Sequence, residues 1–303
     1  MVNTSQRDIA VVGLGAMGLP MATRLACRFS VTACDISSDQ RAKASQAGVQ
    51  AAASPAAAVA NVPIALLSVR TADQVDAALF GPDGLVEANQ PPHTVILTST
   101  VGPKAAARIG GELHRRGIEL IDAPISGGPT RAGSGELLIM AAAQPEVLER
   151  AEPLLSHLGK TVTVVGTRAG DGQAAKAINQ LLAGVHIAAA AEAVALAHSL
   201  GLDPTAIIEA LQDGAAASFM LGDRGPRMIQ ALTDQTEVRS RLDIFTKDLG
   251  IVLDIGRELA VALPTTAAAH QLYLVGESQG LAQRDDSSIV TILSPAEAKR
   301  ETP

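Results

Sequence analysis

One lysine, Lys176, stands near the start of a long apolar stretch, where an amine could transfer a proton. Two amides, Asn179 and Gln180, follow three and four positions later, so all three lie on one face of a helix. Burial would lower the pKa of such a lysine, and an amine with a lowered pKa can act as acid and base. The alternative is a snorkelling lysine whose stem covers apolar surface. This helix alone leaves both interpretations open.

A second segment, Ser126-Gly127-Gly128, could hold an anion. Bare backbone N–H groups beside a serine hydroxyl suit a carboxylate. The same three residues also fit an ordinary turn. Asp122, just before them, is interpreted as structural, since an acid there would repel an acidic substrate.

A second lysine, Lys247, lies in another apolar helical stretch beside Asp248. A salt bridge with Asp243 or Asp248 is the simplest interpretation of this lysine. The histidines of the helical segments are interpreted as ordinary helix residues.

The elements that position these side chains begin with a glycine-rich turn. Residues 8–13 predict a buried strand and residues after Gly18 a helix to about Cys27. Gly13 permits the tight turn, Gly15 lets the backbone approach a pyrophosphate, and Gly18 lets helix and strand pack closely. The helix N-terminus would face the phosphates. The pattern predicts a dinucleotide site.

An acid ends the second predicted strand, residues 30–35. Asp35 lies where a carboxylate accepts a hydrogen bond from the ribose 2′-OH and repels a 2′-phosphate. The sequence therefore favours NAD over NADP, although Arg41 and Arg70 leave room for NADP. The alternative is that Asp35 only caps the next turn.

Further strands are expected at residues 63–69, 94–100, 118–123, 135–143 and 161–165. They alternate with helices, including residues 103–116 and 145–158. This alternation predicts parallel βαβ units with right-handed crossovers. The fold class is α/β, with an N-terminal doubly wound Rossmann domain over residues 1–166.

The strand pattern ends after Gly166. The stretch 170–200 predicts a helix of about 45 Å that joins two domains. Because it is apolar nearly all round, we expect it to be buried. Helices at 203–212, 240–259 and 264–279 complete an all-α C-terminal domain, residues 167–293. Residues 294–303 predict a disordered tail.

Composition excludes several classes of protein. The 303 residues carry a net charge of −7 without a basic run, so nucleic acid binding is not expected. Cys27 and Cys34 fit reduced thiols. The sequence contains no Cys/His cluster of the kind that binds a metal, so no metal is expected. No signal peptide and no charge-free apolar run of transmembrane length is present. We expect a cytoplasmic protein without a membrane partner.

Together these motifs resemble the β-hydroxyacid dehydrogenase family, which includes 3-hydroxyisobutyrate dehydrogenase and tartronate semialdehyde reductase. GLGAMG, STVGP, DAPISGG, GDGQAAKAINQ and KDLGIVLD occur in the family's order and spacing, over residues 9–293. The resemblance implies an NAD-dependent enzyme that oxidises a small hydroxy acid. It implies that Lys176 is the acid/base, that Ser126, Gly127 and Gly128 bind the carboxylate, and that Asn179 or Gln180 orients the substrate. The cofactor residues it implies are Gly13, Leu14, Gly15, Ala16, Met17, Gly18, Asp35, Val69, Arg70, Gln74, Thr100 and Lys247.

Two departures from the family pattern occur at Asn179-Gln180, where most members have Asn-Asn, and at Val69-Arg70, where Leu-Pro is usual. Residues 179–193 and 242–254 are more similar to the L-threonate dehydrogenase branch. That branch oxidises the C2 hydroxyl of a four-carbon sugar acid. The alternatives are an imine reductase, against which Lys176 argues, and a catalytically silent dinucleotide sensor. The long apolar helix also suggests a homodimer or homotetramer formed through the helical domain.

Overall fold

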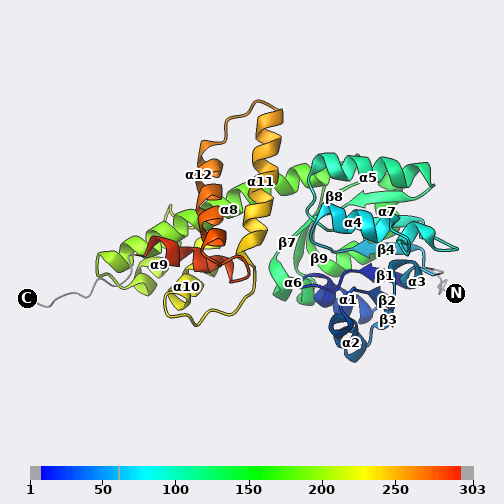
Figure 1. Ribbon diagram of the computed structural model, residues 1–303, viewed down its shortest axis with the longest axis horizontal. Helices are drawn as coiled ribbons and strands as arrows, with labels where there is room; N and C mark the ends of the chain where they lie inside the picture. Colours follow the sequence, from blue (N-terminus) through cyan, green and yellow to red (C-terminus); the bar gives the residue numbers. More distant parts are fainter. Residues whose placement is uncertain (1–7, 61, 295–303) are drawn as a thin grey trace, which may run out of the picture. The chain divides into compact units, whose positions relative to one another are not determined.

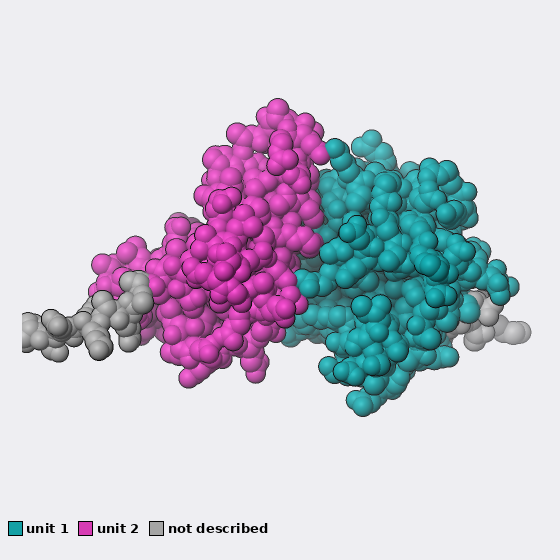
Figure 2. All heavy atoms as spheres, in the orientation of Figure 1, with its two compact units in different colours: residues 1–176 teal, residues 177–303 magenta. Residues whose placement is uncertain are grey.

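The computed structural model describes residues 8–60 and 62–294. The chain divides into two compact units, Met1–Lys176 and Ala177–Pro303, shown in different colours in Figure 2. Each unit has its own hydrophobic core and is described separately. Residues 295–303 of the predicted tail lie outside the described residues.

The first unit is built on one sheet (Figure 1). Strand β1 (Asp8–Val12) lies inside it, parallel to β2 (Ser30–Cys34) on one side and to β4 (Ile64–Leu67) on the other. β5 (Thr94–Leu97) and β6 (Glu119–Asp122) continue the parallel part. Their apolar residues are buried, as expected for parallel strands covered by helices on both faces. The predicted doubly wound domain is confirmed.

The far end of the sheet differs from the expected all-parallel arrangement. β8 (Leu137–Ala142) runs antiparallel to β6 and to β7 (Ile125–Ser126), and parallel to the edge strand β9 (Gly159–Gly166). Strands β7 and β3 (Gln50–Ala52) were not predicted, because two or three residues are too few for a pattern to emerge. The strand order is β3-β2-β1-β4-β5-β6-β8-β7, with β9 beside β8.

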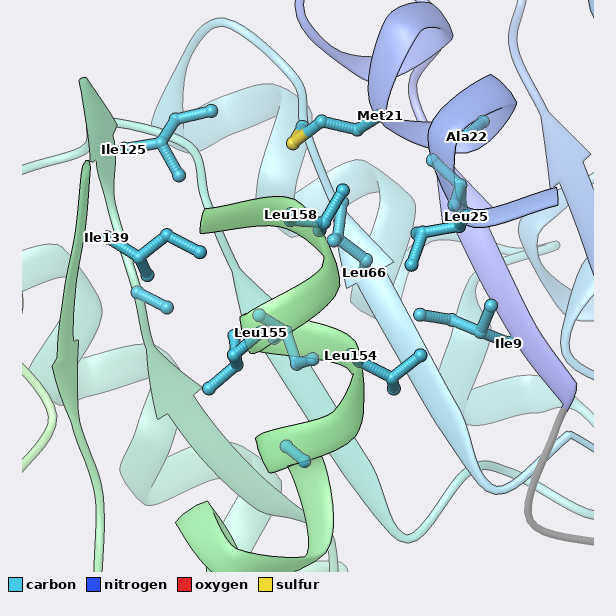
Figure 3. Packing of buried hydrophobic residues seen from close by; sticks show 14 of the residues in the cluster. Ile9, Met21, Ala22, Leu25, Leu66, Ile125, Ile139, Leu154, Leu155 and Leu158 are labelled. Carbon is cyan, nitrogen blue, oxygen red and sulfur yellow. The ribbon is translucent and has the colours of Figure 1, made fainter. Parts of the chain in front are cut away.

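Helices cover both faces of this sheet. One core joins α1 (Gly18–Ala26) and α7 (Pro145–Leu158) to the strands, as Figure 3 shows around Ile9, Leu25 and Leu154. The other core lies under α4 (Ala72–Phe80) and α5 (Pro103–Arg115). The remaining helices of this unit are α2 (Ser38–Gln46), α3 (Pro55–Ala58), η2 (Leu85–Glu87) and α6 (Gly128–Ser134).

Side-chain caps begin three of these helices. Ser37, Ser54 and Thr71 each accept a hydrogen bond from the backbone N–H three residues ahead. Oε1 of Gln74 in turn accepts a hydrogen bond from the N–H of Arg70, at 2.9 Å. Local sequence therefore sets where these helices start.

The second unit is helical. Its elements are α8 (Asp171–Ser199), which begins in the first unit, α9 (Pro204–Gln212), α10 (Phe219–Ala231), α11 (Leu242–Glu258), α12 (Pro264–Ser278), η3 (Asp286–Ile289) and α13 (Val290–Leu293). Tyr273 is fully buried and stacks on Phe245. Helix α10 was not predicted, because two glycines and Pro226 obscure its pattern.

The expectation that α8 is buried nearly all round is wrong. Ile178, Leu182 and Leu196 are 65%, 50% and 61% exposed, whereas Ile187 and Ala191 on the other side are fully buried. By length and hydropathy this is the one helix in the described chain that could cross a membrane, but half of the relevant window is buried. The core helix of a soluble protein also meets these criteria of length and hydropathy, so they alone are weak evidence for a membrane span.

Candidate functional site

The glycine-rich turn connects β1 to α1. Gly13 has φ +93°, and a Cβ there would lie 2.5 Å from the carbonyl oxygen of Ser68. A Cβ on Gly18 would overlap the carbonyl oxygen of Gly13, so strand and helix pack as closely as the sequence predicts. A Cβ on Gly15 would meet no atom within 4 Å. The turn is therefore closed toward the protein and open at Gly15, as a cradle for a pyrophosphate must be.

The rest of the turn fits the same cradle. Leu14 is buried in the core, whereas Ala16 is exposed and Met17 is half-buried at the N-cap position of α1. The N-terminus of α1 therefore lies beside the open side of the turn, where its dipole favours an anion.

The carboxylate of Asp35 follows β2, as expected. Its Oδ2 accepts a hydrogen bond from the N–H of Leu14 at 2.6 Å, and its Oδ1 accepts one from the N–H of Ser37 at 2.8 Å. Asp35 thus ties the glycine turn to the end of β2 and also begins the next turn, as the alternative interpretation proposed. Each carboxylate oxygen has a further lone pair that a ribose hydroxyl can use.

The residues expected along the cofactor follow β4 and β5. The N–H of Val69 donates to Oγ of Ser99 at 2.9 Å, which joins the ends of these two strands. Arg70 and Gln74 are exposed, and Thr100 is half-buried. The side-chain oxygen of Gln74 is bonded to the backbone of Arg70, so its local role is to order this loop.

The segment expected to hold a carboxylate links β7 to α6. Ser126 ends β7 and pairs with Leu138. Ser126, Gly127 and Gly128 are all half-buried. Gly127 has φ +142° and Gly128 has φ +75°, so both use backbone conformations that favour glycine. A Cβ on Gly128 would meet no atom within 4 Å. The segment is a special turn with open space at Gly128.

Lys176 lies in α8 and is 6% exposed. It belongs to the same compact unit as residues 126–128 and the glycine turn. One turn before it, Gln173 is 1% exposed and is hydrogen-bonded to Asp122. Asp122 also accepts from the N–H of Gly170, which fits its interpretation as structural.

The amides after Lys176 and the second lysine form a chain of hydrogen bonds within the second unit. Nδ2 of Asn179 donates to Oε1 of Gln180 at 2.9 Å, and Nε2 of Gln180 donates to Oδ2 of Asp248 at 2.6 Å. Nζ of Lys247 lies 2.6 Å from Oδ1 of the same carboxylate. The salt bridge that was the simplest interpretation of Lys247 is therefore present, with Asp248 as its partner. Asp243 instead pairs with Arg241.

Sequence reasoning missed Gln173, which no motif assigned a role. The signal that could have found it is a large polar side chain three residues before Lys176, between Gly172 and two alanines. Among the described residues, no cluster of three His, Cys, Asp or Glu side chains could hold a metal ion.

A doubly wound sheet, a glycine turn with an open side and an acid after the second strand define a dinucleotide-binding protein. Residues 8–166 match the family model described as the NAD binding domain of 6-phosphogluconate dehydrogenase. Residues 170–293 match the model described as NAD-binding of NADP-dependent 3-hydroxyisobutyrate dehydrogenase. The chain belongs to the β-hydroxyacid dehydrogenase family.

Curated relatives cover nearly the whole chain. An L-threonate dehydrogenase of Cupriavidus necator is 41% identical over 287 residues, 94% of this chain and 96% of that protein. A 2-hydroxy-3-oxopropionate reductase of Escherichia coli is 33% identical over 94% of this chain and 96% of its own. The crystal structure of a 3-hydroxyisobutyrate dehydrogenase from Salmonella typhimurium is 33% identical, has a TM-score of 0.86, and covers 94% of this chain and 99% of that one.

The chain is therefore an oxidoreductase that acts on CH–OH groups with a nicotinamide dinucleotide cofactor. The expected enzyme class is confirmed. The expected cofactor is confirmed as a nicotinamide dinucleotide.

Proposed function

We propose that this protein oxidises the C2 hydroxyl of L-threonate and transfers the hydride to NAD. The observation that carries the substrate assignment is the run of five L-threonate dehydrogenases that are 32–41% identical over at least 94% of this chain. The alternative substrates within the family are 3-hydroxyisobutyrate and tartronate semialdehyde.

Lys176 is the proposed general acid/base. Its 6% exposure supports this role, because an amine shielded from water can exchange a proton with the substrate rather than with solvent. Ser126 and the N–H groups of Gly127 and Gly128 are proposed to bind the substrate carboxylate. An anion held there would direct the neighbouring hydroxyl to the amine in the same unit.

Oxidation of the hydroxyl removes a hydride from C2 and a proton from the oxygen, and each has a proposed acceptor. When bound, the nicotinamide would supply the acceptor for the hydride that leaves C2. The neutral amine of Lys176 takes the hydroxyl proton as the C–O bond becomes a carbonyl. In the reverse direction, the ammonium form returns that proton to the forming alkoxide.

The remaining residues are proposed to hold the cofactor and the substrate. Asp35 would accept from the ribose 2′-OH and favour NAD, although Arg41 lies beside it, with Nη1 2.6 Å from the Asp35 carbonyl oxygen. Asn179 is favoured over Gln180 as the amide that orients the substrate, because Gln180 already bonds at both ends. The other proposed cofactor residues are residues 13–18, Val69, Arg70, Gln74, Thr100 and Lys247.

The test is a spectrophotometric screen of NAD and NADP reduction with L-threonate, 3-hydroxyisobutyrate and glycerate. We expect turnover with L-threonate and NAD; turnover with another acid alone would contradict the substrate assignment. NAD binding without turnover on any acid would favour the dinucleotide sensor. Reduction of cyclic imines without oxidation of hydroxy acids would favour the imine reductase.

The role of Lys176 is tested by Lys176→Met, with Lys160→Met on the exposed edge of β9 as the matched control. Loss of general acid–base assistance should lower kcat by about 10²–10⁴-fold while NADH still binds. The control should keep the kcat of the wild type. A Lys176→Met enzyme with near-normal kcat would overturn the assignment.

We further propose a homodimer or homotetramer formed through the helical unit, in the cytoplasm and without nucleic acid or membrane partners. The exposed apolar side chains of α8, including Ile178, Leu182 and Leu196, support an interface on this helix. The assembly is tested by light scattering. A particle of 31.0 kDa, the mass of one chain, would refute it.

A further inference from the structure

The buried amide of Gln173 uses its whole hydrogen-bonding capacity. Its Oε1 accepts from the N–H groups of Val101 at 2.9 Å and Gly102 at 3.1 Å. Its Nε2 donates to the carbonyl oxygen of Ser99 at 3.0 Å and to Oδ1 of Asp122 at 2.9 Å. A primary amide offers two acceptor and two donor positions, and all four are filled. The side chain therefore has one orientation.

Asp122 caps α8 although it comes from the end of β6. Its Oδ2 accepts from the N–H of Gly170 at 2.8 Å and of Gln173 at 3.0 Å. N–H groups in the first turn of a helix have no partner within the helix, and a carboxylate there also complements the helix dipole. Asp122 is fully buried, so its charge depends on these bonds.

The start of α8 has little room to shift. A Cβ on Gly172 would lie 2.6 Å from the carbonyl oxygen of Asp122 and 2.9 Å from that of Met140. A Cβ on Gly170 would lie 2.9 Å from the carbonyl oxygen of Pro103. The helix therefore starts in direct contact with the end of β6, with Met140 within β8 and with the start of α5.

Lys176 follows Gln173 by three residues, so the two lie one turn apart on the same side of α8. The bonds of Gln173 thus join the turn that precedes Lys176 to the backbone of residues 99–102, which includes Thr100. We propose that Gln173 and Asp122 are positioning residues that fix the amine of Lys176 relative to the segment after β5. This inference rests on the proposed role of Lys176.

The test compares full-length Gln173→Leu, Gln173→Glu and the double variant Gln173→Glu/Asp122→Asn. In Gln173→Glu, a carboxylate oxygen replaces the donor and faces both Asp122 and the Ser99 carbonyl. In the double variant, the new amide at position 122 can donate to the new carboxylate at position 173 and still accept from the helix N–H groups, so only Ser99 loses its donor. Leu154→Ala, which leaves a cavity in the core under α7, controls for lost stability, because the core cluster that contains Leu154 includes no residue of α8.

We expect kcat of both single variants to fall about 10²-fold, as for a misplaced catalytic group, while the Kd for NADH stays unchanged. The double variant should recover about tenfold of that loss, because the donor–acceptor match with residue 122 returns. Leu154→Ala should keep its kcat. Single variants with the kcat of Leu154→Ala, or a double variant no better than Gln173→Glu, would overturn the proposal.

A second measurement separates this inference from the proposed function. The rate at which an acylating reagent modifies Lys176, followed by peptide mass mapping, reports the surroundings of the amine without turnover. We expect Gln173→Leu to change this rate and Leu154→Ala to leave it unchanged. If the wild type oxidises no hydroxy acid, the proposed function fails while this rate still tests the positioning role. An unchanged rate in Gln173→Leu would refute that role.

Discussion

Gly15→Ala isolates the contribution of the glycine turn to cofactor binding. The added methyl group meets no protein atom within 4 Å, so the free energy of unfolding should change by at most about 0.5 kcal/mol. The same methyl group would occupy the space through which a pyrophosphate approaches the backbone. We expect the affinity for NADH to fall at least about tenfold, or about 1.4 kcal/mol.

Two other glycines provide the comparison. In Gly18→Ala the new Cβ overlaps the Gly13 carbonyl and lies 3.4 Å from Cβ of Ser68, so the packing of α1 on β1 should lose about 1–3 kcal/mol. Gly111→Ala, at an exposed position of helix α5, has its nearest contact at 4.0 Å and should stabilise by up to about 1 kcal/mol.

Urea unfolding and fluorescence titration with NADH measure the two effects separately. Gly15→Ala should lose binding without stability, Gly18→Ala should lose both, and Gly111→Ala should keep binding. If Gly15→Ala bound NADH as tightly as the wild type, the open side of the turn would not be the pyrophosphate site. If Gly18→Ala unfolded like the wild type, the close-packing argument would be wrong.

Three further predictions concern buried polar groups. Tyr273→Phe removes a hydrogen bond of 3.0 Å from the buried hydroxyl to the Gly184 carbonyl, and urea unfolding should show a loss of about 1 kcal/mol; an unchanged midpoint would contradict it. Burial raises the pKa of Cys34 to about 12, so iodoacetamide at pH 8 should label exposed Cys27 and spare Cys34 until the protein unfolds. Equal labelling of both thiols in the native protein would refute this. Burial also raises the pKa of Asp122 above 3.8, against hydrogen bonds from Gln173. Because the folded state then binds this proton more tightly than the unfolded state, the stability of the wild type relative to Asp122→Asn should be greatest below about pH 4 and should fall as the pH rises through the raised pKa. If the stability of the wild type relative to Asp122→Asn instead grew with pH, the pKa of Asp122 would be lowered in the folded state and the prediction would be wrong.

Local sequence patterns determined much of the first unit. The apolar runs of β1, β2, β4, β5 and β6 and the caps of α2, α3 and α4 were predictable, because burial on both faces and capping depend on neighbouring residues. The spacing of Gly13, Gly15 and Gly18 identified the dinucleotide turn, because this turn is formed by consecutive residues of the chain. Five motifs together, including those around Lys176 and Lys247, indicated the family.

The tertiary structure alone decided which side chains meet. Gln173 and Asp122 are 51 positions apart, and Gln180 and Asp248 are 68 apart, so no local pattern could pair them. The antiparallel course of β8 and the half-exposed α8 also depend on how distant segments pack. Periodicity shows that a residue is suited to burial, but only the packed chain determines what covers it and which donors its polar groups reach.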